Sequence, residues 1–262
     1  DRLRSRGLGD VYKRQGIWIG SYFGGVNYYP RSYTHFEKYY PKGEENSLHG
    51  KRVREFCRDN YGVLWIGTED GGLNRFNLNT KEFSFFAPSA GFTNIHGLCL
   101  VDDKLWVGTF SKGLKIIDTR TGTVLKTYQK NSSPRSLIDN SIFAICRTAT
   151  GDIYLGTMFG LVKYNKQSDD FDRIPELNGK FVYDIKEDSG GNIWLATYAN
   201  GAYCYNVNDR KWKNYVHDEK DTTSLSYNKV SSIFEDSYHR IWLTTQGLSL
   251  IHISEPTRPE PI

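Results

Sequence analysis

Residues 53–77 read VREFCRDNYGVLWIGTEDGGLNRFN, and this stretch contains the pattern that decides the fold. Its first part, Val53–Asp59, alternates as a half-buried strand does. A short turn with Asp59 and Gly62 follows, in which Asp can bond its own backbone and Gly supplies a positive φ. The phrase LWIGT around Trp65 then predicts a second strand, and the residues after Gly72 predict a third.

The central phrase recurs along the chain as IWIGS, LWIGT, LWVGT, IYLGT, IWLAT and IWLTT. The successive spacings are 47, 41, 48, 40 and 48 residues. Periods of about 40–50 residues with so much β character are typical of propeller blades. We expect the six aromatic residues of these phrases to occupy equivalent strands and to be mostly buried. They are Trp18, Trp65, Trp106, Tyr154, Trp194 and Trp242.

The same register continues beyond each phrase. A glycine follows the phrase in five repeats, and large apolar residues stand four and eleven positions after that glycine, as Phe76 and Phe83 do after Gly72. Each repeat therefore predicts four strands, here called A (the V-x-x-[IF] segment), B (the LWIGT phrase), C and D. We predict an all-β protein, a β-propeller with an open arc of four complete four-stranded blades plus two partial blades.

The composition agrees with many short strands, since aromatic residues make up 15% of the chain and glycine occurs 25 times. The two ends differ from the repeats: residues 5–15 (SRGLGDVYKRQ) and 248–258 (LSLIHISEPTR) resemble a sequencing adapter translated from its two strands. We expect residues 1–15 and 248–262 to be non-native adapter-derived segments and residues 16–247 to be the propeller repeats.

Charge and hydropathy limit the partners of residues 16–247. This part holds 28 Lys and Arg against 26 Asp and Glu, so it lacks the basic excess of a nucleic-acid-binding protein. No run approaches the ~18 apolar residues of a membrane span. We expect neither a nucleic-acid partner nor contact with a membrane in this part of the chain.

Candidate binding residues lie where the repeats differ, in the loops between strands B and C. The B–C and D–A loops are expected on the same face, where aromatic rings suit stacking on sugars and where carboxylates and amides suit hydroxyl groups. The alternative is that some of these side chains merely cap the blades. The D–A loops add His49, Lys51, Arg52, His96, Asn140 and Asn228. The B–C candidates are Tyr22, Phe23, Glu69, Asp70, Phe110, Met158, Phe159, Tyr198 and Asn200.

No pattern of a catalytic, metal or cofactor site is visible. The histidines show no ligand spacing, and no nucleophile elbow or phosphate loop occurs. Cys57, Cys99 and Cys146 stand at the same position of three A strands, and Cys204 stands in a C strand. We expect them to be buried free thiols, because paired Cys/His spacing is absent and equivalent positions of neighbouring blades are too far apart for a disulfide.

The repeat unit resembles the two-component regulator propeller repeat, and residues 53–77 match it nearly letter for letter. The resemblance implies a seven-bladed, non-catalytic sensor propeller, periplasmic as the extracytoplasmic part of an inner-membrane hybrid histidine kinase. It also implies oligosaccharide ligands and a homodimer in the full-length protein, although free thiols are uncommon in oxidising compartments.

Two other classes stay open at this point. A propeller enzyme, a polysaccharide lyase or glycosidase, would need a cluster of acid, base or paired carboxylate groups in one axial pocket. A protein-interaction scaffold would need a broad exposed apolar face.

Overall fold

The computed structural model describes residues 17–21, 25–29, 39–86 and 92–246. The chain forms two compact units, residues 1–39 and 40–262. The first contains β1 (Ile17–Ser21) and β2 (Gly25–Tyr29), which pair antiparallel. These two strands correspond to B and C of the first, partial repeat.

The second unit contains four complete blades, each an antiparallel sheet of four strands that follow one another in the chain. The blades carry the A, B, C and D strands at the positions predicted from the repeat. The strands are β3 (Val53–Arg58), β4 (Val63–Thr68), β5 (Gly72–Asn77), β6 (Phe83–Phe85); β7 (Ile95–Val101), β8 (Lys104–Thr109), β9 (Leu114–Asp118), β10 (Val124–Tyr128); β11 (Ile142–Arg147), β12 (Ile153–Thr157), β13 (Gly160–Asn165), β14 (Asp170–Arg173); β15 (Val182–Glu187), β16 (Ile193–Thr197), β17 (Ala202–Asn206) and β18 (Lys211–Tyr215).

A last, partial blade consists of an A and a B strand, β19 (Val230–Glu235) and β20 (Ile241–Thr245). Within the described residues the only helix is a short 3₁₀ turn, Pro175–Leu177. No described helix is long and apolar enough to cross a membrane. The prediction of four complete blades between two partial ones is confirmed.

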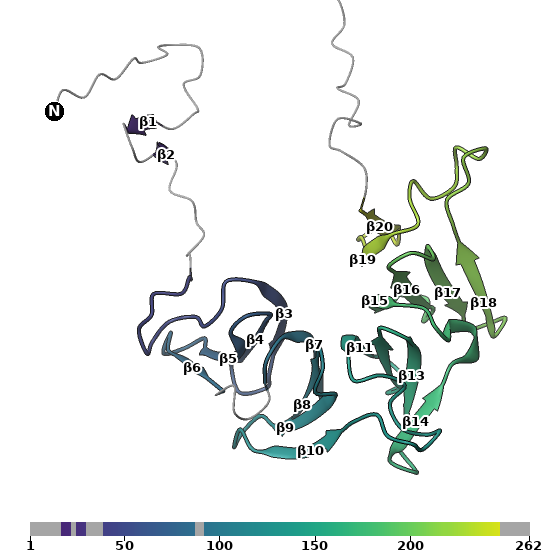
Figure 1. Cartoon of the computed structure of the whole chain (residues 1–262), viewed down its shortest axis with the longest axis horizontal. Coiled ribbons are helices and arrows are strands. Elements are labelled where there is room, and N and C mark those ends of the chain that lie inside the picture. Colours follow the sequence, from purple (N-terminus) through teal and green to yellow (C-terminus); the bar gives the residue numbers. More distant parts are fainter. Residues whose placement is uncertain (1–16, 22–24, 30–38, 87–91, 247–262) are drawn as a thin grey trace, which may run out of the picture. The chain divides into compact units, whose positions relative to one another are not determined.

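The A strands are the innermost strands of the second unit, and each lies against the A strand of the next blade, in the order β3, β7, β11, β15 and β19 (Figure 1). The D strands of the complete blades lie at the outside. Each B strand also packs on the following A strand, so the hydrophobic core sits between blades as well as within them.

Four of the repeat aromatic residues pack into this core: Trp65 and Trp106 are buried, and Tyr154 and Trp194 are half-buried. Trp65 is fully buried, Trp106 is 5% exposed, and both lie in clusters that span two blades. Burial of such a ring contributes on the order of 2–3 kcal/mol. Trp242 was expected to be buried but is 53% exposed, because no described blade follows its partial blade to cover it. The side chain of Trp18 lies outside the described residues.

The cysteines are free thiols among the described residues. Cys57, Cys99 and Cys146 are half-buried and pack against successive core clusters, and Cys204 is buried in β17. Burial raises the pKa of each of the four thiols to about 11. The three equivalent cysteines are less buried than the sequence predicted.

Every A strand has a β-bulge at its second residue. In β3, for example, Val53 pairs with Thr68 and Glu55 with Gly67, so that Arg54 has no partner on β4. A bulge frees one residue from the ladder and re-aims its side chain. The same shift recurs in the other four A strands. The freed residues are Arg54, His96, Phe143, Tyr183 and Ser231.

Candidate functional site

The B–C turns of the complete blades share one hydrogen-bonded geometry. In the first complete blade, the buried Thr68 donates its hydroxyl to the carbonyl of Gly72 at 2.9 Å and accepts the N–H of Gly71 at 3.0 Å. Gly72 has a φ of 76°, and a Cβ there would lie 2.1 Å from the carbonyl oxygen of Phe92. The other three complete blades repeat the threonine bond. Because this geometry recurs in each complete blade, the turns differ from one another mainly in the residues between the threonine and the glycine.

The B–C turns lie beside the start of the A strands. The first turn residue donates its N–H to the residue just before the bulged strand, as Phe110 does to the carbonyl of Asn94 at 3.0 Å and Tyr198 to that of Phe181 at 3.0 Å. Glu69 makes the same bond to Arg52 at 2.9 Å. The B–C loops and the ends of the D–A loops therefore share one face, as predicted, called here the B–C face.

Aromatic rings from three blades meet on this face. The ring of Phe143, on β11, lies 4.5 Å from His96, 4.4 Å from Phe181 and 5.7 Å from Tyr183, measured between ring centroids. Phe143 is only 6% exposed and forms the centre of the group.

The two outer members of the group come from B–C turns and are exposed. Phe110 is 38% exposed and lies 5.9 Å from His96, and Tyr198 is 43% exposed and stacks on Phe181 at 5.4 Å. The six residues are called here the aromatic cluster: His96, Phe110, Phe143, Phe181, Tyr183 and Tyr198.

Arg54 joins the cluster to the first complete blade. Its guanidinium lies 5.3 Å from the ring centroid of Tyr183, and Nη2 donates to the Tyr183 hydroxyl at 3.3 Å. Its Nε lies 3.5 Å from the carboxylate of Glu69, which also approaches Arg52 at 3.6 Å. The planar guanidinium can therefore present further donors beside the aromatic surface.

Two buried polar atoms at the cluster have no hydrogen-bond partner within the described residues: Nδ1 of His96 and Oδ1 of Asn94. Burial, helped by the nearby charge of Arg54, lowers the pKa of His96 to about 4, so the imidazole is neutral at physiological pH. An unpaired polar atom in a buried position carries a cost in free energy that a bound ligand or water can relieve.

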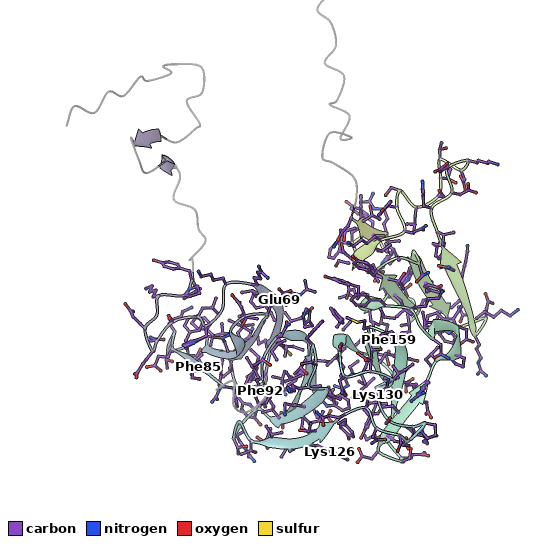
Figure 2. The ribbon with its side chains drawn as sticks, viewed as in Figure 1. Glu69, Phe85, Phe92, Lys126, Lys130 and Phe159 are labelled. Carbon is purple, nitrogen blue, oxygen red and sulfur yellow. The ribbon has the colours of Figure 1, made fainter. Side chains whose placement is uncertain are left out.

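The other sequence-predicted residues are not members of the aromatic cluster. Asp70 is exposed, but its carboxylate accepts the backbone N–H groups of Lys51 and Arg52 at 2.9–3.1 Å, so it shapes the loop. Phe159 is 52% exposed and shows no ring contact with the cluster among the described residues; Figure 2 labels it together with Glu69. Met158 and Asn200 are half-buried, while Tyr22 and Phe23 lie outside the described residues.

Sequence reasoning missed Phe143, Phe181, Tyr183 and Arg54. The second residue of each described A strand differs from repeat to repeat, but so does the third, so variation alone did not mark these positions. The bulge that turns the second residue toward the B–C face has no signal in the sequence either.

A cavity of about 210 Å³ lies between the A strands, lined among others by Glu55, Ala144, Asp184 and Ile233. Burial and the charge of Asp184 raise the pKa of Glu55 to about 7. Burial also raises the pKa of Asp184, although its carboxylate accepts the N–H of Ile233 at 2.9 Å and the hydroxyl of Ser232 at 3.1 Å.

One serine–histidine–carboxylate group occurs at the A–B turns, at the opposite ends of the B strands. The hydroxyl of Ser189 and the carboxylate of Glu235 both approach Nδ1 of His239, at 2.8 and 3.2 Å. A catalytic triad needs the serine on one ring nitrogen and the acid on the other. No group of three potential metal ligands occurs among the residues that the structure describes.

Three segments of the chain match a family model described as two component regulator propeller: residues 47–70, 176–199 and 224–247. Each segment spans an A and a B strand. The chain carries two-component regulator propeller repeats. The matched segments contain β3–β4, β15–β16 and β19–β20, and the blades between them repeat the same strands and turns.

Among curated proteins, the propeller repeats are similar to Histidine kinase P4 of Formosa agariphila, with 26% identity over 162 residues, or 62% of this chain. The match covers 9% of that kinase, so the chain spans a small part of the relative's length.

Two solved structures show the fold. One is the extracellular domain assigned to a hybrid two component system of B. thetaiotaomicron, with a TM-score of 0.52, 23% identity and coverage of 89% of this chain and 36% of that one. The other is virginiamycin B lyase of Staphylococcus aureus, with a TM-score of 0.56, 15% identity and coverage of 73% and 62%. At these identities the likeness establishes the β-propeller architecture alone.

Proposed function

We propose that this chain is the ligand-sensing part of a two-component sensor and that its B–C face binds an oligosaccharide without altering it. The aromatic cluster carries the proposal: rings from three blades form one continuous group, and its outer members Phe110 and Tyr198 are exposed. Flat rings held on rigid turns suit the apolar faces of sugar units, while polar groups beside them suit the hydroxyls.

Polar groups for such a ligand stand at the cluster. Arg54, beside Tyr183, offers guanidinium donors, and Glu69 offers a carboxylate acceptor. Each stacked ring contributes roughly 1 kcal/mol beyond burial of its area. A ligand that spans the cluster would contact three blades at once and would fix their relative angle.

We also propose that the chain lies outside the cytoplasm. Its signal would pass to a histidine kinase that lies outside these repeats, and dimerisation would transmit it. The family match and the printed descriptions of the relatives, a histidine kinase and an extracellular domain of a hybrid two component system, support this reading. The proposal assigns no catalytic residue.

Calorimetric titration tests the proposal directly. The chain is titrated with short plant and host oligosaccharides, and each recovered ligand is analysed by mass spectrometry after prolonged incubation. We expect saturable binding of at least one oligosaccharide with the ligand recovered intact. Recovery of cleaved or unsaturated products would favour a lyase or glycosidase, and absence of binding across the panel would contradict the sensor proposal.

A further inference from the structure

The A–B turns are acidic, whereas the residues around the B–C turns are basic. The A–B turns stand at one end of the B strands and the B–C turns at the other. In the described A–B turns, six aspartates stand with one arginine, Arg240. They are Asp59, Asp102, Asp103, Asp152, Asp188 and Asp236.

The residues around the B–C turns are basic instead. The B–C turns and the starts of the A strands are together called here the rim. Each A-strand start contributes four residues: the two before the strand and the first two of the strand. The charged groups of the rim are two carboxylates, Glu69 and Asp70, and six cations. The cations are Lys51, Arg52, Arg54, Lys112, Lys180 and Lys229.

Both carboxylates of the rim are already engaged by the protein. Glu69 lies between Arg52 and Arg54, and Asp70 accepts two backbone N–H groups. In contrast, within residues 39–86 and 92–246 no carboxylate lies at ion-pair distance from the ammonium groups of the rim lysines. These are Lys51, Lys112, Lys180 and Lys229.

One of these lysines lies directly on the aromatic cluster. The ammonium group of Lys229 lies over the ring of Tyr198, 4.1 Å from its centroid, and Tyr198 is an exposed member of the cluster. Arg54 lies over Tyr183 in the same way at 5.3 Å. A cation held over an exposed aromatic group is placed to pair with an anionic group on a sugar bound at the cluster.

We infer that the oligosaccharide recognised at the B–C face is acidic, with uronate carboxylates that pair with the rim cations. The inference rests on the proposed function and names the ligand class of the same site. A basic rim beside an aromatic surface attracts a polyanion, whereas the aspartates of the A–B turns disfavour it at the other end of the B strands. A neutral sugar would leave the rim lysines without a carboxylate partner.

Matched pairs of ligands separate this inference from the proposed function. We would titrate the 262-residue chain with tetragalacturonic acid and its fully methyl-esterified form, and with a cello-oligosaccharide and its C6-oxidised uronate form. We expect the acid member of at least one pair to bind about tenfold or more tighter than its neutral partner. This preference should shrink as salt rises from about 20 to 200 mM, because the rim charges are exposed.

The triple variant Lys112→Gln, Lys180→Gln and Lys229→Gln should remove most of the preference for the acid. The matched control Lys104→Gln, Lys166→Gln and Lys211→Gln makes the same change in net charge away from the rim and should keep the preference. Equal binding of acid and neutral partners would overturn the inference and leave the proposed function standing. Absence of binding in both pairs would overturn the inference and count against the oligosaccharide proposal itself.

Discussion

The indole Nε1 of Trp65 donates a hydrogen bond to Oδ2 of Asp59 at 2.9 Å. The other carboxylate oxygen accepts the N–H groups of Tyr61 and Val63, both at 2.9 Å. One buried side chain thus closes the A–B turn and fixes the largest ring of the blade. Asp188 and Trp194 repeat the bond at 2.8 Å, so the aspartate of this turn is explained by structure and requires no catalytic role.

Replacement of Asp59 by alanine should destabilise the second unit. The change leaves an indole N–H and two backbone N–H groups without their acceptor, and we expect the free energy of unfolding to fall by about 2–4 kcal/mol. Urea unfolding followed by tryptophan fluorescence measures the loss. The control Asp118→Ala removes a carboxylate that bonds residues of a C–D turn but no indole, and should cost less. Equal losses would contradict the role given to the indole bond.

The B–C turns should tolerate no side chain at their glycine. A Cβ on Gly201, at a φ of 73°, would lie 2.0 Å from the carbonyl oxygen of Tyr215, so Gly201→Ala must displace backbone and should cost about 3 kcal/mol or more. Gly151 also has a positive φ, 87°, but a Cβ there would meet nothing within 4 Å. Gly151→Ala should therefore cost only about 1 kcal/mol in the same unfolding experiment. Similar losses for the two variants would show that the positive φ alone, and not the close contact of a Cβ, explains the need for glycine.

The raised pKa of Glu55 predicts a pH dependence of stability. The folded protein holds this proton up to about pH 7, whereas the unfolded chain releases it near the ordinary value of 4.5. The free energy of unfolding should therefore fall as pH rises from 4.5 to 7. Glu55→Gln keeps the shape without the charge beside Asp184 and should add about 1–3 kcal/mol at pH 8.

Two comparisons isolate the contribution of Glu55 to the pH dependence of stability. Glu82→Gln, at an exposed position, is the matched control for the loss of one carboxylate. His96 acts in the opposite sense, because its pKa is lowered to about 4 and the unfolded imidazole gains its proton near 6.5; this group lowers stability as pH falls from 6.5 to 4. A Glu55→Gln profile parallel to that of the parent chain would contradict the assignment.

The thiols should react slowly in the folded protein. A pKa of about 11 leaves the four cysteines with about a hundredfold less thiolate at pH 8 than at the ordinary value of 9.0. We expect a thiol reagent to label the native chain at least tenfold more slowly than the chain in denaturant, followed by mass spectrometry. Rapid labelling of Cys57, Cys99 or Cys146 in the native protein would show that their half-buried sulfur atoms are open to solvent.

Much of the fold could be predicted from the sequence, because each blade has the same four strands and packs residues at equivalent positions into the core. In the four complete blades, the aromatic residue of strand B and the threonine three positions later recur at constant spacing, and the structure puts them on equivalent strands; the turn glycine follows three or four positions after the threonine. The exposure of Trp242 was not foreseen, because burial of this residue depends on a covering strand and not on its own repeat.

The candidate site could be predicted only in part. Phe110 and Tyr198 were found because B–C loops vary in sequence, and the structure places both in the aromatic cluster. Phe143 and Tyr183 were not found, since simple alternation along an A strand does not reveal a bulge. The loop-shaping contacts of Asp70 depend on the path of the D–A loop, which no local pattern specifies.

The most direct test of the account is the location of the binding surface. Calorimetry with the oligosaccharide that binds best would compare the double variant Phe110→Ala and Tyr198→Ala with the control Tyr61→Ala and Tyr238→Ala, which removes two exposed rings from the A–B face. We predict a dissociation constant about ten- to a hundredfold higher for the first variant and an unchanged one for the control. Equal affinity of the first variant and the parent chain would contradict the aromatic cluster as the binding site.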